Sequence, residues 1–296
     1  MNGIINIYKE AGYTSFDVVA KMRGILKIKK MGHTGTLDPD ATGVLPVCIG
    51  NGTKLVELFS DHEKEYIAEL RLGVATDTQD LSGEILKTSP VEVSCEEIRE
   101  AVLSFVGEYM QLPPMYSAVK VNGKKLYELA REGKEVERKA RLVSFREIEI
   151  LSMELPVVKI RVVCSKGTYI RTLCNDIGEK LGCFGAMKSL IRTRVGMFKL
   201  EDAITLEELE QYRDAGKLAE ILLPSDSIFM HLPAVYAKPE NCRFLDNGNA
   251  MYPNMLIKSP YFKDGQEVRM YGGEKFYGIY QFVAKESKLK PVKMFL

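Results

Sequence analysis

The spacing of apolar residues predicts a chain in which helices and strands interleave. Residues 14–17, Thr-Ser-Phe-Asp, have the pattern of a capping box, and the apolar positions after them recur at helical spacing. The same capping pattern at 94–97 and at 205–208 predicts two further helices. An alternating pattern over 66–72, with Tyr66, Ala68, Leu70 and Leu72 on one face, and a similar pattern over 157–164 predict two strands.

The pattern changes after about residue 224. Residues 224–233 begin and end with proline and are typical of a linker. Beyond them, turn-forming Asp-Gly and Gly-Gly pairs separate short segments of strand character, among them 275–283 and 289–295. A length of 296 residues also suggests about two domains. We therefore expect a larger domain over 1–230 and a small β domain over 231–296.

Three other segments have a weaker pattern. Residues 166–171 predict a turn into a helix, with Thr168 as its N-cap. The stretch 124–141 is strongly basic and predicts only a brief helix around 126–131. Residues 44–49 are continuously apolar, which is compatible with a buried strand or with the start of a helix.

A long polar loop is expected between residues 32 and 43. Glycines at both of its ends allow the backbone to approach a ligand closely, and Pro39 fixes the backbone next to Asp38. A single carboxylate on such a loop can act as a nucleophile, a general base or a metal ligand. Taken alone, these residues leave open the simpler interpretation that Asp38 and Asp40 only cap turns.

Charge is distributed unevenly along the chain although the net charge is only +1. Residues 120–146 carry nine Lys or Arg against four Glu, and 159–199 carry nine against two acids. Residues 77–108 and 201–226 each carry eight acids against two bases. This segregation is typical of a protein with one basic face for a polyanion, although ordinary solvated helix faces would also explain it.

Composition narrows the class of protein. No apolar run approaches the ~20 residues that span a bilayer, and the N-terminal residues lack the pattern of a signal peptide. The 6 Cys form no CxxC pair and the 3 His are far apart, so we expect reduced thiols, no metal site and a cytoplasmic protein. The chain also lacks GxGxxG and P-loop patterns, so no nucleotide cofactor is expected.

The loop and its neighbours carry a specific resemblance. GHTGTLDPDATGVLPVCIG, residues 32–50, resembles the catalytic signature of the TruB family of tRNA pseudouridine synthases, which act on the T-loop uridine at position 55. The resemblance covers about residues 3–200, and the tail resembles the PUA domain that often follows this catalytic core. Further blocks occur in the family's order: NGIINIYKEAGYTSFDVV, GTKLVELF, KEYIAELRLG, TDTQDLSGE, PPMYSAVKVNGKKLYELAREG, CSKGTYIRTLCNDIGEKLG and LIRTRVGMF.

The resemblance implies a fold and a domain arrangement. It implies an α+β pseudouridine synthase fold whose central sheet is mixed and mainly antiparallel, with the site in a central cleft. Residues 1–230 would be the catalytic domain, and a basic segment of about 113–146 would clamp RNA. Residues 231–296 would be a PUA-like RNA-binding domain.

The resemblance also implies the reaction. Uridine becomes pseudouridine when the N1–C1′ bond breaks, the base turns and C5 bonds to C1′, without cofactor or metal. Asp38 matches the family's nucleophile, and Arg171 matches its partner, which we expect to keep the pKa of Asp38 low. Tyr66 matches the active-site tyrosine, whose ring stacks on uracil and whose hydroxyl, or a water bound to it, takes the C5 proton.

Other residues match positions that contact substrate. His33 matches the residue that fills the space left by the flipped base, Tyr169 and Leu190 match pocket walls, and Lys54 matches a recurrent lysine that we assign to substrate binding. Asp40 departs from the family pattern, and we expect it to point away from Asp38. The expected partner is the T-stem and loop of tRNA, with no membrane, and the expected state is a monomer.

Two other functions remain open from the sequence. One is a non-catalytic tRNA-binding or tRNA-folding protein of the same fold. The other is a base glycosylase that also depends on a carboxylate. The sequence also leaves open whether Asp38 attacks C1′ or C6 or promotes a glycal route.

Overall fold

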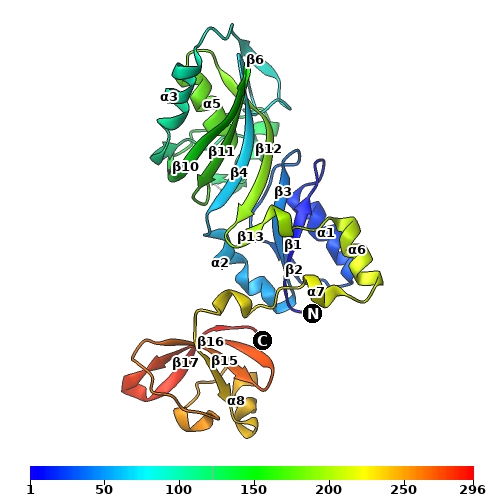
Figure 1. Cartoon of the computed structure of the whole chain (residues 1–296), viewed down its shortest axis with the longest axis vertical. Coiled ribbons are helices and arrows are strands. Elements are labelled where there is room, and N and C mark those ends of the chain that lie inside the picture. Colours follow the sequence, from blue (N-terminus) through cyan, green and yellow to red (C-terminus); the bar gives the residue numbers. More distant parts are fainter. Residues whose placement is uncertain (122) are drawn as a thin grey trace.

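Two β-sheets organise the chain, for which a computed structural model describes residues 1–121 and 123–296 (Figure 1). In the larger sheet, every pair of described neighbouring strands is antiparallel except β12 with β3, which confirms a mixed and mainly antiparallel sheet. Its strands in spatial order, with the two side strands last, are β1 (Gly3–Lys9), β3 (Thr42–Ile49), β12 (Gly185–Val195), β4 (Lys64–Leu72), β11 (Val157–Cys164), β10 (Arg141–Glu154), β7 (Gly107–Gln111), β13 (Phe198–Lys199) and β2 (Met31–His33).

Helices pack against both halves of this sheet. In Figure 1, α3 and α5 lie beside the half of the sheet that is made by β4, β10, β11 and β12. Helices α1 and α6 lie beside the other half, at β1 and β3. The predicted capping boxes are confirmed at the starts of α1, α3 and α6. The helices are α1 (Ser15–Leu26), α2 (Val56–Ser60), α3 (Cys95–Leu103), α4 (Leu126–Arg131), α5 (Ile170–Lys180), α6 (Leu206–Asp214), α7 (Leu218–Ile221) and α8 (Cys242–Asp246).

Two local predictions need correction. The N-cap of α5 is Tyr169 and not Thr168, because the carbonyl of Tyr169 accepts the first intrahelical bond, from the N–H of Leu173 at 3.1 Å; the Thr168 hydroxyl donates instead to the carbonyl of Ser165 at 2.9 Å. The loop expected over 32–43 is shorter, since β2 extends through His33 and β3 begins at Thr42. The predicted brief helix over 126–131 is confirmed as α4, and the apolar run 44–49 belongs to strand β3.

The smaller sheet contains the strands expected in the C-terminal tail. Its order is β14 (Ala234–Ala237), β15 (Glu267–Gly272), β16 (Lys275–Val283) and β17 (Lys288–Met294). These strands and α8 enclose a hydrophobic core of their own. A second apolar cluster joins the tail to the larger sheet, since Phe229, Ile279 and Phe295 pack with Phe59 and Phe198.

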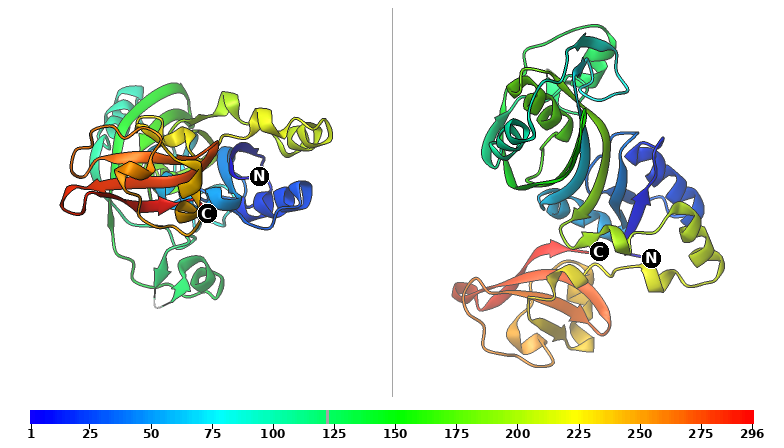
Figure 2. Two further views of the ribbon diagram at one scale, coloured as in Figure 1. Left: turned by 90° about the horizontal axis from the view of Figure 1, so that it is seen from below. Right: turned by 45° about the horizontal axis from the view of Figure 1, so that its top comes forward.

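The basic segment has little regular structure. It contains the two-stranded pairing of β8 (Lys120–Val121) with β9 (Lys124–Lys125), followed by α4. The left view of Figure 2 shows the chain around α4 projecting from the body of the molecule. The expected RNA-clamping segment 113–146 includes Asn122, which lies outside the described residues.

A further pair of strands, β5 (Val74–Thr76) and β6 (Ile85–Thr88), forms a hairpin after β4. The turn of this hairpin contains the TDTQDLSGE block and contributes to the candidate site described below. In the part of the chain that the structure describes, no helix has the length and apolar character needed to cross a bilayer.

Candidate active site

Asp38 lies on the loop that joins β2 to β3, and this loop is firmly anchored. The backbone N–H of Leu37 donates to the hydroxyl of Ser15 at 2.8 Å, and the Leu37 side chain is buried. The ammonium of Lys9, which is 0% exposed, donates to the carbonyls of Pro39 at 2.8 Å and Ala41 at 2.6 Å. These bonds on both sides of Asp38 leave its carboxylate little freedom to move.

Arg171 forms a two-pronged ion pair with Asp38. Its Nε lies 3.0 Å from Oδ2 of Asp38, and its Nη2 donates to Oδ1 at 3.1 Å. Arg171 occupies the first turn of α5, and its side chain is 7% exposed, whereas that of Asp38 is 37% exposed. The structure therefore brings together the two predicted residues and leaves the acid accessible beside a buried cation.

The pKa of Asp38 shifts in the opposite direction from our expectation. We expected Arg171 to keep the pKa of this carboxyl low, but burial raises the pKa above its usual value and outweighs the lowering by Arg171. Asp80 raises the pKa further, and Lys9 opposes it. Asp80 is thus the acid with the largest effect on the pKa of Asp38, and Asp40 is exposed.

The turn between β5 and β6 supplies contacts that the sequence analysis missed. Oδ2 of Asp80 lies 3.6 Å from Nη1 of Arg171, and the same Nη1 donates to the carbonyl of Thr78 at 3.1 Å. Nη2 of Arg171 also donates to the carbonyl of Tyr116, at 2.8 Å, where the basic segment begins. The TDTQD and PPMYS blocks were the only signal in the sequence, and they did not specify these contacts.

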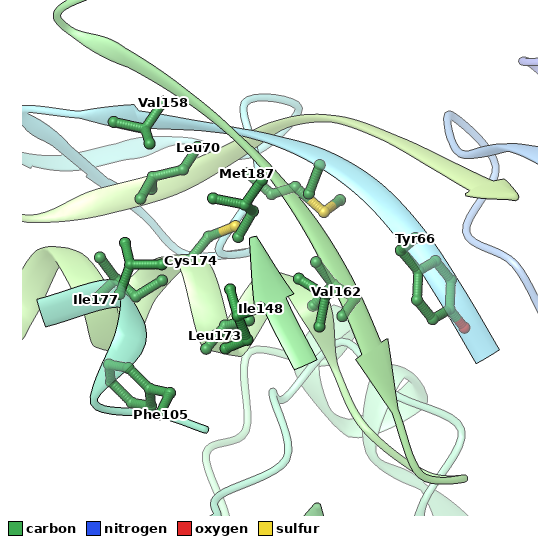
Figure 3. Close-up of a cluster of buried hydrophobic side chains, with 14 of the residues drawn as sticks. Tyr66, Leu70, Phe105, Ile148, Val158, Val162, Leu173, Cys174, Ile177 and Met187 are labelled. Atoms are coloured by element: carbon green, nitrogen blue, oxygen red, sulfur yellow. The ribbon is translucent and has the colours of Figure 1, made fainter. Parts of the chain in front are cut away.

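Tyr66 lies on β4 at the edge of the largest hydrophobic cluster. Figure 3 shows its hydroxyl turned away from the aliphatic side chains of that cluster. The residue is 8% exposed, and burial raises the pKa of its hydroxyl, with Asp38 acting in the same direction and Arg192 against it. Tyr66 is therefore a neutral phenol at pH 7. Leu190, a predicted pocket wall, is buried two residues away from Arg192 on the neighbouring strand β12.

Arg192 is another residue that the sequence analysis missed. It faces Tyr66 in the register of β4 and β12 and is 1% exposed. Its Nε donates to the carbonyl of Val44 at 2.7 Å, and its Nη2 donates to the carbonyl of Gly35 at 3.1 Å. This buried guanidinium therefore ties the Asp38 loop to β12, the strand that lies beside β4.

The predicted substrate-contacting residues lie in different surroundings. His33 is at the end of β2, its Nδ1 is buried without a hydrogen-bond partner among the described residues, and burial lowers its pKa. Tyr169 precedes Arg171 at the start of α5, where its backbone N–H and C=O bond to the side chain of Gln111 at 2.8 and 3.0 Å. His33 thus flanks the Asp38 loop, and Tyr169 flanks Arg171.

Lys54 lies elsewhere. It belongs to the short 3₁₀ helix Gly50–Leu55, and its ammonium donates to the carbonyl of Leu296 at 3.3 Å. Its contact in this structure is with the C-terminal tail and not with Asp38, Tyr66 or Arg171. The predicted contact of Lys54 with substrate stays a prediction.

The chemistry available at this site is that of a carboxylate and its charged neighbours. Within residues 1–121 and 123–296, no group of three or more His, Cys, Asp or Glu side chains has a metal-binding arrangement. A carboxylate held by a bidentate arginine is oriented and, when ionised, can attack an electrophilic carbon. A phenol beside it offers a ring for stacking and a hydroxyl for proton transfer.

Comparisons with known proteins found matching family models and relatives along most of the chain. The family model for the TruB family pseudouridylate synthase N-terminal domain matches residues 23–170, and the model for the tRNA pseudouridylate synthase B C-terminal domain matches residues 171–230. Over 278 residues the chain is 52% identical to tRNA pseudouridine synthase B of Alkaliphilus oremlandii (strain OhILAs), covering 94% of this chain and 92% of that protein. It is also 52% identical to the protein of the same name from Lachnoclostridium phytofermentans (strain ATCC 700394 / DSM 18823 / ISDg), with all of both chains covered.

Solved structures show the same likeness. A chain of a Cbf5-Nop10-Gar1 complex matches with a TM-score of 0.70 and 29% identity, covering 99% of this chain and 85% of that chain. A chain of an H/ACA RNP bound to a substrate RNA containing 2′-deoxyuridine matches with a TM-score of 0.69 and 27% identity, with the same coverage.

Proposed function

The chain belongs to the TruB family of pseudouridylate synthases, and from this premise we propose that it converts uridine 55 in the T-loop of tRNA to pseudouridine with Asp38 as nucleophile. The observation that carries the assignment of Asp38 is its bidentate ion pair with Arg171 on an anchored loop. The reaction needs a carboxylate close to the sugar and base, as in retaining glycosidases. An acid that is partly exposed and held by a buried cation meets that need.

We assign orientation of the nucleophile to Arg171, and base stacking and proton transfer to Tyr66. Arg171 orients Asp38 and stabilises its ionised form against the burial that favours protonation. The ring of Tyr66 stacks on the uracil, and its hydroxyl, or a water bound to it, takes the proton that C5 loses when C5 bonds to C1′. The N1–C1′ bond breaks during the same reaction. The product is therefore an isomer of the substrate, and no cofactor is consumed.

Recognition of tRNA requires that the target base leave its stack. Extruding a base costs a few kcal/mol, and side chains that fill the vacated space reduce this cost. We assign that role to His33, pocket-wall roles to Tyr169 and Leu190, and a contact with tRNA to Lys54. The basic segment 113–146 supplies the cations that bind backbone phosphates.

The test of the nucleophile is the substitution Asp38→Asn, which keeps the size of the side chain and removes its nucleophilic oxygen. Pseudouridine formation should fall by on the order of 10⁴-fold, as it does when other catalytic nucleophiles are removed, while tRNA binding is retained. Asp40→Asn in the same loop is the matched control and should stay within about twofold of the wild-type rate. A rate for Asp38→Asn close to that of the wild type would refute the assignment.

The same assay separates the two alternative functions. A non-catalytic tRNA-binding protein would bind tRNA but release no tritium from 5-³H-uridine. A base glycosylase would release free uracil, whereas an isomerase releases none. Chromatography of digested tRNA distinguishes all three outcomes, and a nucleotide-resolution map identifies the modified position.

We also propose the domain arrangement and the state of the protein. Residues 1–230 form the catalytic domain, and 231–296 form a PUA-like RNA-binding domain, supported by the separate hydrophobic core of the tail. The protein acts as a monomer in the cytoplasm, where its buried thiols stay reduced; burial raises the pKa of Cys48 to about 12, for example. Light scattering and footprinting of bound tRNA would test the oligomeric state and the role of the tail.

A further inference from the structure

We propose that Tyr116 is a positioning residue that couples the RNA-clamping segment to the Asp38–Arg171 ion pair. Its hydroxyl fixes the start of that segment against the β5–β6 turn, and its carbonyl oxygen holds the guanidinium of Arg171 in the orientation that Asp38 needs. The inference rests on the proposed function, because its effect is measured on the same reaction.

The coupling is a chain of contacts from one segment to the other. The hydroxyl of Tyr116 donates to Oδ2 of Asp77 at 3.2 Å, and Oδ1 of Asp77 accepts from the backbone N–H of Glu84 at 2.8 Å. The carbonyl of the same Tyr116 accepts from Nη2 of Arg171 at 2.8 Å. A single residue thus contacts both the turn that borders the site and the cation that orients the nucleophile.

Bonds at Nη1, Nη2 and Nε fix the orientation of the Arg171 guanidinium. Its Nη2 is shared between Tyr116 and Asp38, its Nη1 is bonded to Thr78, and its Nε is paired with Asp38. Because the guanidinium is planar and rigid, a shift of one acceptor rotates the whole fork. Loss of the Tyr116 anchor would therefore loosen the pair at Asp38 without removing any group that touches substrate.

The location of Tyr116 explains why such coupling would be useful. The residue lies at the start of the basic segment, whose backbone folds back on Ser117 through a bond from the N–H of Tyr127 at 3.1 Å. Tyr116 itself is only partly buried, so a movement of the segment when RNA binds can reach its hydroxyl. Such a change would then reach the ion pair through the Tyr116 carbonyl and Arg171.

The test is Tyr116→Phe, which keeps the ring and removes the hydroxyl. We expect the single-turnover rate at saturating tRNA to fall about tenfold while the Kd for tRNA changes less than twofold. We also expect the acid limb of the rate profile to move to higher pH, because Arg171 would lower the pKa of Asp38 less effectively. A purely structural role would not move the pH profile.

Two comparisons make the test decisive. Tyr109→Phe is the matched control, because the hydroxyl of Tyr109 also donates to an aspartate, Asp176, at 2.9 Å, but away from the ion pair; it should leave rate and pH profile unchanged. In an Arg171→Lys background, which lacks the fork, Tyr116→Phe should cost less than twofold, since residues that act through one another are not additive.

Three outcomes would overturn the inference: an unchanged rate in Tyr116→Phe, a loss confined to Kd, or an equal loss in the Arg171→Lys background. The proposed function stands or fails separately, because it depends on pseudouridine formation by the wild type and on its loss in Asp38→Asn.

Discussion

The site around Asp38 and the basic segment 113–146 are built in opposite ways. Arg171 is 7% exposed at its side chain and bonds to three other residues, whereas Lys124 and Lys134 are 59% and 61% exposed and pair with Glu132 on the same segment. Burial strengthens and orients the first set of charges, while water and salt weaken the second. The difference suits the proposed roles, in which fixed charges carry out the chemistry and exposed charges bind the phosphate backbone.

Among changes that compare the two regions, the largest difference should come from replacing one arginine by lysine in each region. Arg171→Lys keeps the charge but loses the fork that binds Asp38, Thr78 and Tyr116, so the single-turnover rate should fall about 10²-fold. Arg138→Lys in the basic segment, where Nη1 bonds to the carbonyl of Pro113, should change the rate less than twofold. Equal effects of the two changes would contradict the contrast between the regions.

The second comparison is the effect of pH: the rate should depend on pH more steeply than the Kd for tRNA does. In the proposed function Asp38 reacts as the carboxylate. Burial raises its pKa above the ordinary 3.8, so protonation begins at a higher pH than for an exposed aspartate. Below this pKa the saturating single-turnover rate should rise tenfold per pH unit, and above it the rate should level off. The Kd for tRNA, measured by filter binding over the same range, serves as the control. A rate that stays flat down to the ordinary aspartate pKa would contradict the raised value.

The smallest effect on chemistry should come from neutralising the exposed lysines of the basic segment. Replacing Lys120, Lys124 and Lys139 by Gln should weaken tRNA binding several-fold and reduce the salt dependence of log K by ~0.7–0.9 for each phosphate that a lysine no longer neutralises. The saturating single-turnover rate should stay within about twofold of the wild type. Lys217→Gln, in the acidic segment 201–226, is the control and should change neither quantity. A lower saturating rate in the triple variant would show that these charges act on chemistry as well.

Local signals in the sequence predicted the elements that neighbouring residues control. The capping boxes predicted the starts of α1, α3 and α6, because a cap is a bond between residues three apart. The alternation over 66–72 predicted most of β4, because the alternation also depends only on neighbouring residues. In contrast, β10 and β12 were not predicted, because register shifts interrupt both strands and break the two-residue period.

The candidate site was predicted only in part. The resemblance to a family brought Asp38 and Arg171 together, although they are 133 residues apart, and the structure places them in one ion pair. It did not indicate Lys9 or Arg192, because a lysine on a strand or an arginine in a basic stretch carries no local sign that it will be buried against backbone carbonyls.

The sequence by itself determined the helix starts and the strand character of the tail, because these depend on residue types and their spacing. Only the tertiary structure decided the surroundings of Asp38: burial raises the pKa of its carboxyl despite Arg171, and Asp80 is the acid that raises this pKa further. The reason is that desolvation and Coulomb interactions depend on which distant segments the fold places around a group, and no local pattern records those distances.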